Sequence, residues 1–476
     1  MAMAAAGPVL SDAERRRPNV VFILIDDLGW RDLTCYGSSF YETPCIDRLA
    51  TEGMLFTDAY AACPVCSPTR ASIMSGRYPA RVGVTNYIGG TAKGRLLEAP
   101  YTDHLPAEEV SLASALRGAG YATWHLGKWH LGNRPFFPED HGFEVNRGGC
   151  SWGNPNKGYF SPYGMETLED GPEGEYLTDR LTDEAIRLIR ERDGRPFLTN
   201  FWHYAVHTPI QPKPEDVGYY RDKARRLRLD QVPPFVEGEP YPCDHKKHLK
   251  IQRRIVQSDP AYAAMIANLD TNVGRLLDAL DETGLSDNAI VVFTSDNGGL
   301  ATSEGSPTCN HPLAEGKGWM YEGGTREPLL VRWPGVVRPG SRCSIPVTSP
   351  DFYPTLLEAA GAPPMPEQHV DGVSLMPVLQ EGDALDRDAI FWHYPHYGNQ
   401  GGTPGASVRM GDYKLIEFYE DGRLELYNLR EDVSEAHNLA AEKPDLARRM
   451  QRRLSEWRRE VEAKMPQPNP DYEAPR

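Results

Sequence analysis

Acidic side chains follow two strongly apolar runs of the chain, at the points where the runs end. Asp26 and Asp27 come directly after one run, and Asp296 and Asn297 follow another after a single serine. Converging carboxylates repel one another, and their pKa values rise unless a cation compensates them. Carboxylate and amide oxygens are hard ligands that suit Ca²⁺ or Mg²⁺ rather than Zn²⁺. The alternative is that these acids only cap the following helices, but their repetition at a second run favours a metal site.

A cysteine pair lies in the stretch Cys-Pro-Val-Cys-Ser-Pro-Thr-Arg, which runs from Cys63 to Arg70. No second pair has a spacing that would complete a zinc site, and the prolines are not typical of a redox motif. Arg70 lies four residues after Cys66 and seven after Cys63, and neither spacing is that of a phosphatase loop. Pro68 predicts that a helix begins beside Cys66. The N-terminus of a helix presents free N–H groups and positive potential to an anion.

The two apolar runs, residues 19–25 and 288–294, are continuous and rich in β-branched residues, which predicts strands buried on both faces. Sites in doubly wound sheets form at the carboxyl ends of such strands. Amphipathic helices are expected over residues 43–53, 109–118, 182–192 and 260–280. This alternation predicts an α/β fold in which helices sandwich the sheet, with residues 208–250 as a long surface insertion.

The C-terminal part of the chain has a different pattern. Residues 413–419 and 423–429 flank Glu-Asp-Gly, which predicts a β-hairpin. Apolar residues then recur at spacings of three and four between Leu446 and Val461, which predicts one face of a final helix. The expected parts are 1–377, a large N-terminal domain, and 378–476, a small subdomain with an antiparallel sheet and a terminal helix.

The chain has 476 residues and a formal net charge of −16. This charge opposes binding to nucleic acid or another long polyanion, whereas a small anion would need a local cationic pocket. No apolar run reaches the length of a membrane span. Residues 1–19 read as a polar tail rather than a signal peptide, and eight cysteines in a chain of this length indicate reduced thiols. These features predict a cytoplasmic protein with no nucleic-acid or membrane partner.

Five blocks of the sequence resemble, in order, the signatures of the type I (formylglycine-dependent) sulfatases of the alkaline phosphatase superfamily. The blocks are Ile25–Trp30, Cys66–Pro79, Gly120–Gly132, Ser295–Gly299 and Gly316–Pro328. A lone Cys-x-Pro-x-Arg would be a weak signal, but five ordered blocks are a specific one. The resemblance covers residues 18 to about 440. It implies an alkaline-phosphatase-like fold, with a large mixed sheet between helices, and sulfuric ester hydrolase activity.

The resemblance implies that a separate maturation enzyme oxidises Cys66 to Cα-formylglycine, whose aldehyde hydrates to a geminal diol. One hydroxyl would take the sulfuryl group, and deprotonation of the other would then expel sulfate. A plain serine has no second hydroxyl, so it would remain a stable sulfate ester. The implied cofactor is one divalent cation, Ca²⁺ in preference to Mg²⁺, and Asp296 is the candidate base. The implied ligands of the cation are Asp26, Asp27, Asp296, Asn297 and a hydroxyl of modified Cys66.

The resemblance also implies roles for five basic side chains. Arg70 would hold the diol and balance the carboxylates, and Lys128 and Lys317 would clamp sulfate oxygens. His130 would orient the diol and assist its collapse, and His207 would donate a proton to the leaving oxygen. The alternatives are that the two lysines lie on the surface and that His207 packs in the core. We expect Lys317→Ala to abolish turnover and to leave the melting temperature nearly unchanged.

Aromatic and polar residues are dense over residues 391–400, in a subdomain too small to need such a loop for its own packing. We expect His393, His396 and Arg409 to face the leaving group, with structural packing as the alternative. The segment resembles those of sulfatases that act on galactose-type sugars, which implies exo-acting hydrolysis of galactose or N-acetylgalactosamine sulfate. The alternatives are an arylsulfatase acting on phenolic or steroid sulfates, a phosphonate or phosphate monoester hydrolase, and a binding protein with unmodified cysteine.

Overall fold

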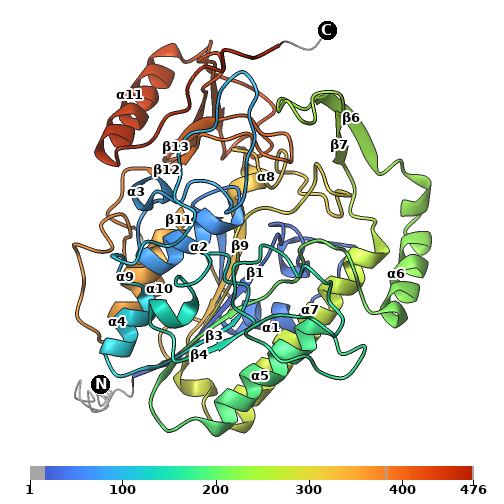
Figure 1. The fold of residues 1–476 in the computed structure, drawn as a ribbon, viewed down its shortest axis with the longest axis vertical. Coiled ribbons are helices and arrows are strands. Elements are labelled where there is room, and N and C mark those ends of the chain that lie inside the picture. Colours follow the sequence, from blue (N-terminus) through green and yellow to red (C-terminus); the bar gives the residue numbers. More distant parts are fainter. Residues whose placement is uncertain (1–16, 381, 383, 474–476) are drawn as a thin grey trace, which may run out of the picture.

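The computed structural model describes residues 17–380, 382 and 384–473 (Figure 1). The polar tail predicted for residues 1–19 lies almost entirely outside the described residues. In the described part of the chain, no helix is long and apolar enough to cross a membrane.

A nine-stranded mixed sheet forms the centre of the molecule. Strand β1 lies between β8 and β5 and is parallel to both, while β9 pairs with β8 in the antiparallel sense. The strand order is β10-β2-β9-β8-β1-β5-β3-β4, and β11 also pairs with β2. The strands are β1 (Asn19–Ile25), β2 (Met54–Tyr60), β3 (Ala122–Gly127), β4 (Val145–Arg147), β5 (Phe197–Trp202), β8 (Ala289–Ser295), β9 (Arg326–Arg332), β10 (Ser341–Cys343) and β11 (Val347–Thr348).

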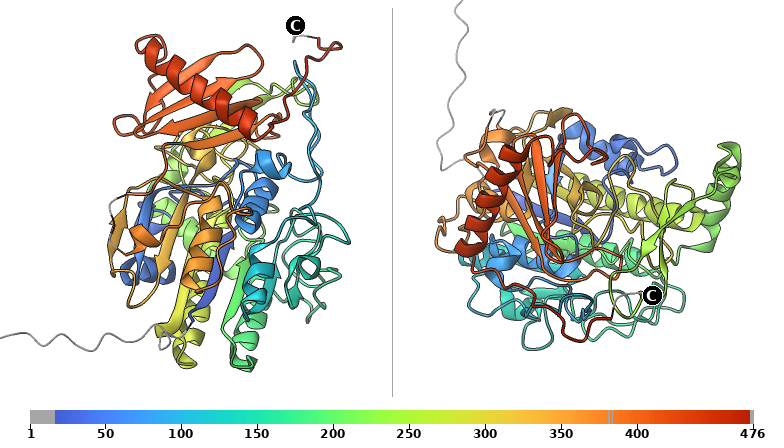
Figure 2. Two further views of the ribbon diagram at one scale, coloured as in Figure 1. Left: turned by 90° about the vertical axis from the view of Figure 1, so that its left-hand side faces the viewer. Right: turned by 90° about the horizontal axis from the view of Figure 1, so that it is seen from above.

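Strand β1 is buried on both faces, as its continuous apolar run predicted. Val21 and Ile23 belong to the core on one face of the sheet, and Val20 and Phe22 belong to the core on the other. This alternation follows from the two-residue repeat of a strand. Helices cover both faces (Figure 2). The helices of the chain are α1 (Pro44–Glu52), α2 (Cys66–Ser75), α3 (Pro79–Val82), α4 (Leu112–Gly118), α5 (Leu177–Glu191), α6 (Pro214–Arg226), α7 (Pro260–Glu282), α8 (Glu322–Thr325), α9 (Phe352–Ala359), α10 (Met376–Leu379) and α11 (Pro444–Glu460).

The four predicted helices are present as α1, α4, α5 and α7, with shifted ends. Helix α4 begins at Leu112 rather than at residue 109 because Ser111 caps it and accepts the N–H of Ser114 at 3.0 Å. Helix α7 is capped in the same way by Asp259, which accepts the N–H of Ala261 at 2.9 Å.

The predicted surface insertion, residues 208–250, is largely exposed but contains regular structure. It holds α6 and β6 (Phe235–Pro240), and β6 pairs in the antiparallel sense with β7 (Lys250–Arg254). This segment projects from the side of the molecule (Figure 2).

A second sheet of four antiparallel strands forms the C-terminal part, and the predicted hairpin is its last pair. Helix α11 covers this sheet with Met450, Leu454 and Trp457 (Figure 1). The predicted fold class is therefore confirmed. The boundary expected after residue 377 falls inside α10 and stays a prediction. The strands of the second sheet are β12 (Ile390–Tyr394), β13 (Gly405–Met410), β14 (Tyr413–Phe418) and β15 (Leu424–Asn428).

Candidate active site

The ends of β1 and β8 bring four predicted metal ligands together. The two strands are parallel neighbours, and Ile25 pairs with Ser295, so the residues that follow lie side by side. The N–H of Asp27 donates to Asp296 Oδ1 at 3.3 Å, and Asn297 Nδ2 donates to Asp27 Oδ1 at 2.8 Å. All four side chains, including Asp26, are buried.

Helix α2 begins at Cys66, directly beside these acids. The Cys66 Sγ atom and one carboxylate oxygen each of Asp26 and Asp296 lie within 4.8 Å of one another. The turn before the helix is held by Thr69, whose Oγ1 donates to the Cys63 carbonyl at 3.1 Å and accepts the Cys63 N–H at 3.2 Å. Burial raises the pKa of the Cys66 thiol. The unmodified residue is therefore held in its neutral form.

Each of the three acids forms an ion pair with one buried base. The nitrogen lies 2.7 Å from the carboxylate oxygen in Lys128–Asp26, Lys317–Asp27 and Arg70–Asp296. With all six groups ionised, three negative and three positive charges balance within the cluster. A buried charge left without its partner is strongly destabilising, so each residue depends on the other member of its pair.

Two buried oxygen atoms in the cluster, Asp26 Oδ1 and Asn297 Oδ1, have no hydrogen-bond partner among the described residues. Burial, reinforced by Asp296 and Asp27 and opposed by Lys128, raises the pKa of Asp26 to about 8. Burial alone would also raise the pKa of Asp27, but Lys317 and His207 lower it below its usual range. Unpartnered carboxylate and amide oxygens beside further carboxylates fit a hard divalent cation.

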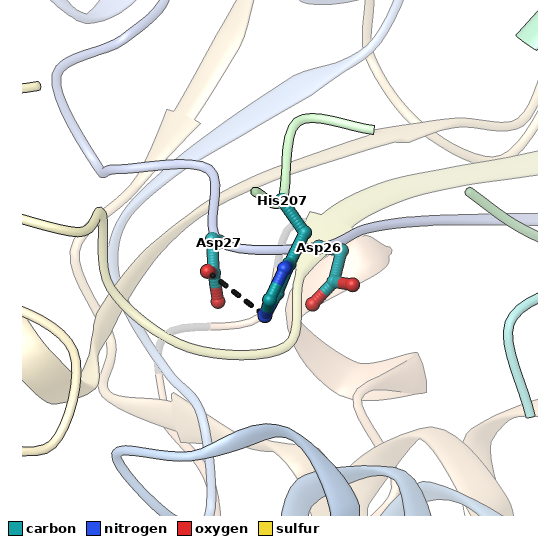
Figure 3. Close-up of side chains that lie close together, drawn as sticks. All are labelled: Asp26, Asp27 and His207. Carbon is teal, nitrogen blue, oxygen red and sulfur yellow. Dashed lines mark ion pairs between the residues drawn. The ribbon is translucent and has the colours of Figure 1, made fainter. Parts of the chain in front are cut away.

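His207 lies between the ends of the two aspartates (Figure 3). Its Nε2 atom is 3.6 Å from Asp27 Oδ2 and 3.0 Å from Lys317 Nζ, which donates to it. The other ring nitrogen, Nδ1, lies 2.8 Å from the Thr208 carbonyl oxygen. Burial, together with Lys317, lowers the pKa of His207 to about 3. His207 and the two aspartates also form a possible metal-binding group, but the hydrogen bond from Lys317 already uses Nε2.

His130 contacts Cys66 directly. Its Nδ1 atom is 3.4 Å from Cys66 Sγ, and its Nε2 atom is 3.1 Å from the carbonyl oxygen of Ile88. Arg70 donates through Nη1 to the Lys128 carbonyl at 2.9 Å, which ties α2 to the turn after β3. The structure thus brings together every catalytic and metal-ligating residue proposed from the sequence.

The three residues proposed to face the leaving group lie outside this cluster, and their role toward the substrate stays a prediction. Both ring nitrogens of His393 are occupied, by the Tyr419 hydroxyl at 2.7 Å and the Lys464 carbonyl at 2.9 Å. Arg409 pairs at 2.7 Å with Asp58.

His396 has partners within the protein too: its Nε2 atom is 2.9 Å from Thr85 Oγ1. His393 lies on β12 and Arg409 on β13, and the pairing of these two strands fixes their positions. Sequence reasoning also missed three residues near Lys317, namely Tyr87, Glu304 and Gln400. Gln400 belongs to the aromatic and polar segment 391–400, which was the available signal.

The comparisons with known proteins agree with this geometry. The sulfatase family pattern matches residues 18–362, and the pattern described as N-sulphoglucosamine sulphohydrolase, C-terminal, matches residues 314–460. A sulfatase of Formosa agariphila is 34% identical, over 95% of this chain and 90% of that protein. The N-acetylgalactosamine-6-sulfatase of Rattus norvegicus is 31% identical, over 83% of this chain and 71% of that protein.

Among solved structures, the crystal structure of Ps i-CgsB in complex with k-i-k-neocarrahexaose aligns with a TM-score of 0.75 and 29% identity, over 93% of each chain. The family pattern spans most of the chain, and the relatives match along most of their own length. The protein therefore belongs to the sulfatase family and is a sulfuric ester hydrolase.

Proposed function

We propose that this enzyme hydrolyses the sulfate ester of a small sugar, with Cys66 converted to formylglycine as its nucleophile. The observation that carries the proposal is the position of Cys66 at the first residue of α2. There its Sγ atom lies within 4.8 Å of oxygens of Asp26 and Asp296. It also lies 3.4 Å from a nitrogen of His130. Burial raises the pKa of this thiol and so disfavours the reactive thiolate, whereas an oxygen nucleophile fits the same contacts.

The unpartnered buried oxygens of Asp26 and Asn297 support a bound divalent cation. The three acids and three bases cancel, so a cation held by Asp26, Asp27, Asp296 and Asn297 would leave the site with a net charge of about +2. That charge suits an anionic sulfate group in a protein whose overall charge is −16. A bound cation would polarise the sulfate and lower the pKa of a neighbouring hydroxyl. Ca²⁺ is preferred over Mg²⁺ on the family resemblance.

In the proposed reaction, one hydroxyl of the hydrated aldehyde at Cys66 attacks sulfur, and the substrate alcohol leaves. The second hydroxyl then loses its proton, the bond between carbon and the sulfated oxygen breaks, and free sulfate and the aldehyde are formed. Asp296 is the proposed base for the attacking hydroxyl. His130, which is 3.4 Å from Cys66 Sγ, is placed to receive the second proton.

The two lysines and His207 are proposed to contact the substrate directly. Lys128 and Lys317 are the donors for the sulfate oxygens, where negative charge is held in the transition state. His207 would protonate the leaving oxygen through Nε2, which accepts from Lys317 in the structure. An anionic substrate beside His207 would favour its protonated form and so oppose the effect of burial.

The sugar is proposed from the resemblance to galactose-type sulfatases and from the similarity to an N-acetylgalactosamine-6-sulfatase. The acidic surface disfavours attack within a long polyanion, so we propose removal of a terminal sulfate. A formylglycine-generating enzyme is the proposed maturation partner. The cytoplasmic location predicted from the sequence also stays a proposal.

Peptide mass analysis combined with a substrate panel tests this function. Protein produced with and without a formylglycine-generating enzyme should differ in the mass of the Cys66 peptide, and turnover should follow the modified fraction. The panel contains sulfated galactose and N-acetylgalactosamine, an aryl sulfate and a phosphonate ester. Cys66→Ala is the matched control and should release no sulfate. Matured protein that turns over phosphonate esters and no sulfate would refute the proposal.

A further inference from the structure

Three loops meet around the turn that carries Lys317. Gly318, the next residue, donates its N–H to the carbonyl of Pro64 at 2.8 Å, which places the turn beside the segment leading to Cys66. A Cβ atom at Gly318 would lie 2.6 Å from Gln400 Oε1, so the loop between β12 and β13 packs directly on the turn. The second loop contains Glu304, and the third contains Tyr87.

Gln400 has a buried amide oxygen that is not used within the protein. The residue is only 3% exposed, and its Oε1 atom has no hydrogen-bond partner in the part of the chain that the structure describes. Its Nε2 atom donates to Glu304 Oε1 at 3.1 Å, which fixes the orientation of the amide. A buried acceptor without a donor is unfavourable, so it indicates a ligand that supplies one.

Glu304 is an exposed carboxylate held in an unusual backbone conformation beside this amide. Its φ is 52°, and Gly305 and Ser306 also have positive φ values of 90° and 42°. Positive φ is uncommon outside glycine, and such residues cluster at functional sites. The carboxylate of Glu304 accepts from Gln400 Nε2, which places it beside the loop that packs on Gly318.

Tyr87 supplies a hydrogen-bond donor beside Asn399, the residue that precedes Gln400. Its hydroxyl oxygen accepts from Asn399 Nδ2 at 2.7 Å, so its own proton remains for another acceptor. Burial, together with the negative charge of Glu304, raises the pKa of Tyr87 to about 12, so the hydroxyl keeps this proton at neutral pH.

We propose that Tyr87, Glu304 and Gln400 form the subsite for the alcohol part of the substrate. Two acceptors and one donor match sugar hydroxyls, which both donate and accept. The carboxylate of Glu304 would repel a second anionic group next to the reacting sulfate. The subsite therefore selects the monosulfate of an otherwise uncharged sugar over a disulfated sugar or a sulfated uronate. This inference rests on the proposed function.

The variant Glu304→Gln tests the charge selection. The measurement is the ratio of kcat/KM for galactose monosulfate to kcat/KM for galactose disulfate, with matured enzyme. We expect the ratio to fall by about tenfold in the variant, the size of effect that one nearby charge exerts in a partly solvated site. Glu462→Gln is the matched control, because Glu462 is also exposed and has a φ of 51°. A ratio equal to that of the wild type would overturn the subsite.

The variant Gln400→Ala tests the proposed hydrogen bond between a sugar hydroxyl and the Gln400 amide oxygen. We expect KM for galactose monosulfate to rise about tenfold while kcat/KM for nitrophenyl sulfate, which lacks sugar hydroxyls, stays within about twofold. Equal losses on both substrates would show that Gln400 only supports its loop, and the inference would fail. Turnover of nitrophenyl sulfate by the wild type checks the proposed function separately, and its absence with every sulfate ester would overturn both.

Discussion

At the scale of single residues, charge pairing links catalysis to stability. Lys128, Lys317 and Arg70 are buried and each lies 2.7 Å from a carboxylate oxygen. The same lysines are the proposed donors to sulfate. Replacing one of them therefore removes a catalytic group and also leaves a buried aspartate without its counterion.

Lys317→Ala should lower kcat/KM by about 10²–10³, the usual loss for one preorganised donor. The sequence alone suggested an unchanged melting temperature, but the buried pair with Asp27 changes that expectation. Breaking such a pair costs about 3–5 kcal/mol, so the melting temperature should fall clearly. Steady-state kinetics and thermal melts of Lys317→Ala, compared with the exposed control Lys157→Ala, check both effects. A variant of normal stability would contradict the pairing.

Removal of divalent cations should reduce both activity and stability. A ligand present at about a hundred times its Kd stabilises the folded state by about 2.7 kcal/mol, so dialysis against a chelator should lower the melting temperature. Adding Ca²⁺ or Mg²⁺ back separately identifies the preferred ion. Asp26→Asn should weaken this response, whereas the exposed Asp421→Asn should not. Chelated protein that keeps its full activity would exclude the metal site.

At the scale of elements, the short helix α8 connects the C-terminal sheet to the active site. The Gly324 carbonyl accepts the N–H of Gly298 at 3.1 Å, directly after the ligand positions of β8. Glu322 in the same helix forms an ion pair at 2.9 Å with Lys414 of β14. The second sheet thus supports the loop on which the proposed metal ligands Asp296 and Asn297 lie.

The contacts of α8 predict a pH effect on stability through Glu435. This buried acid lies 3.1 Å from Lys414. Burial and Glu322, opposed by Lys414, raise the pKa of Glu435 to about 8 from 4.5. Between these values the folded state keeps a proton that the unfolded state releases. The free energy of unfolding therefore falls as pH rises, by at most about 1.4 kcal/mol per pH unit from this group.

Glu435→Gln removes this proton-binding group while keeping its shape. The melting temperature of the variant, relative to that of the wild type, should therefore increase as the pH is raised from about 5 to about 8. Thermal melts of both proteins across this pH range measure the difference. Glu431→Gln, at an exposed position nearby, should follow the wild type. Parallel curves for Glu435→Gln and the wild type would refute the assignment.

At the scale of the whole molecule, the two sheets share one buried interface. Trp392 of β12 donates its indole N–H to the Ala61 carbonyl at 2.8 Å. The same core contains Tyr60 and Val65 from the segment that leads to Cys66, and Ile416 from β14. The C-terminal sheet therefore completes the core beneath the proposed nucleophile.

This shared core predicts one cooperative unfolding transition, although the chain forms two sheets. Calorimetry should give a single peak, and loss of activity on heating should coincide with it. A chain ending at residue 377 should fail to fold into an active enzyme, because it would expose the Tyr60 and Val65 side of the interface. Two separate transitions, or an active truncated chain, would show that the sheets are independent.

The sequence by itself predicted strands β1 and β8, the C-terminal hairpin, helices α1, α4, α5, α7 and α11, and the residues of the central cluster. A strand buried on both faces must be continuously apolar, so β1 and β8 were recognisable, and acids could lie only at their ends. The family blocks then singled out Cys66, Lys128 and Lys317. These features are local, and spacing along the chain is enough to predict them.

Only the tertiary structure decided which acid pairs with which base and which residues form the proposed subsite. Lys317 and Asp27 are 290 positions apart, and no local pattern relates Tyr87, Glu304 and Gln400. His393 and Arg409 had suitable chemistry, but the packing of their strands gave them partners inside the protein. Long-range contacts depend on how the two sheets and the loops pack in three dimensions, and the spacing of residues along the chain does not encode that packing.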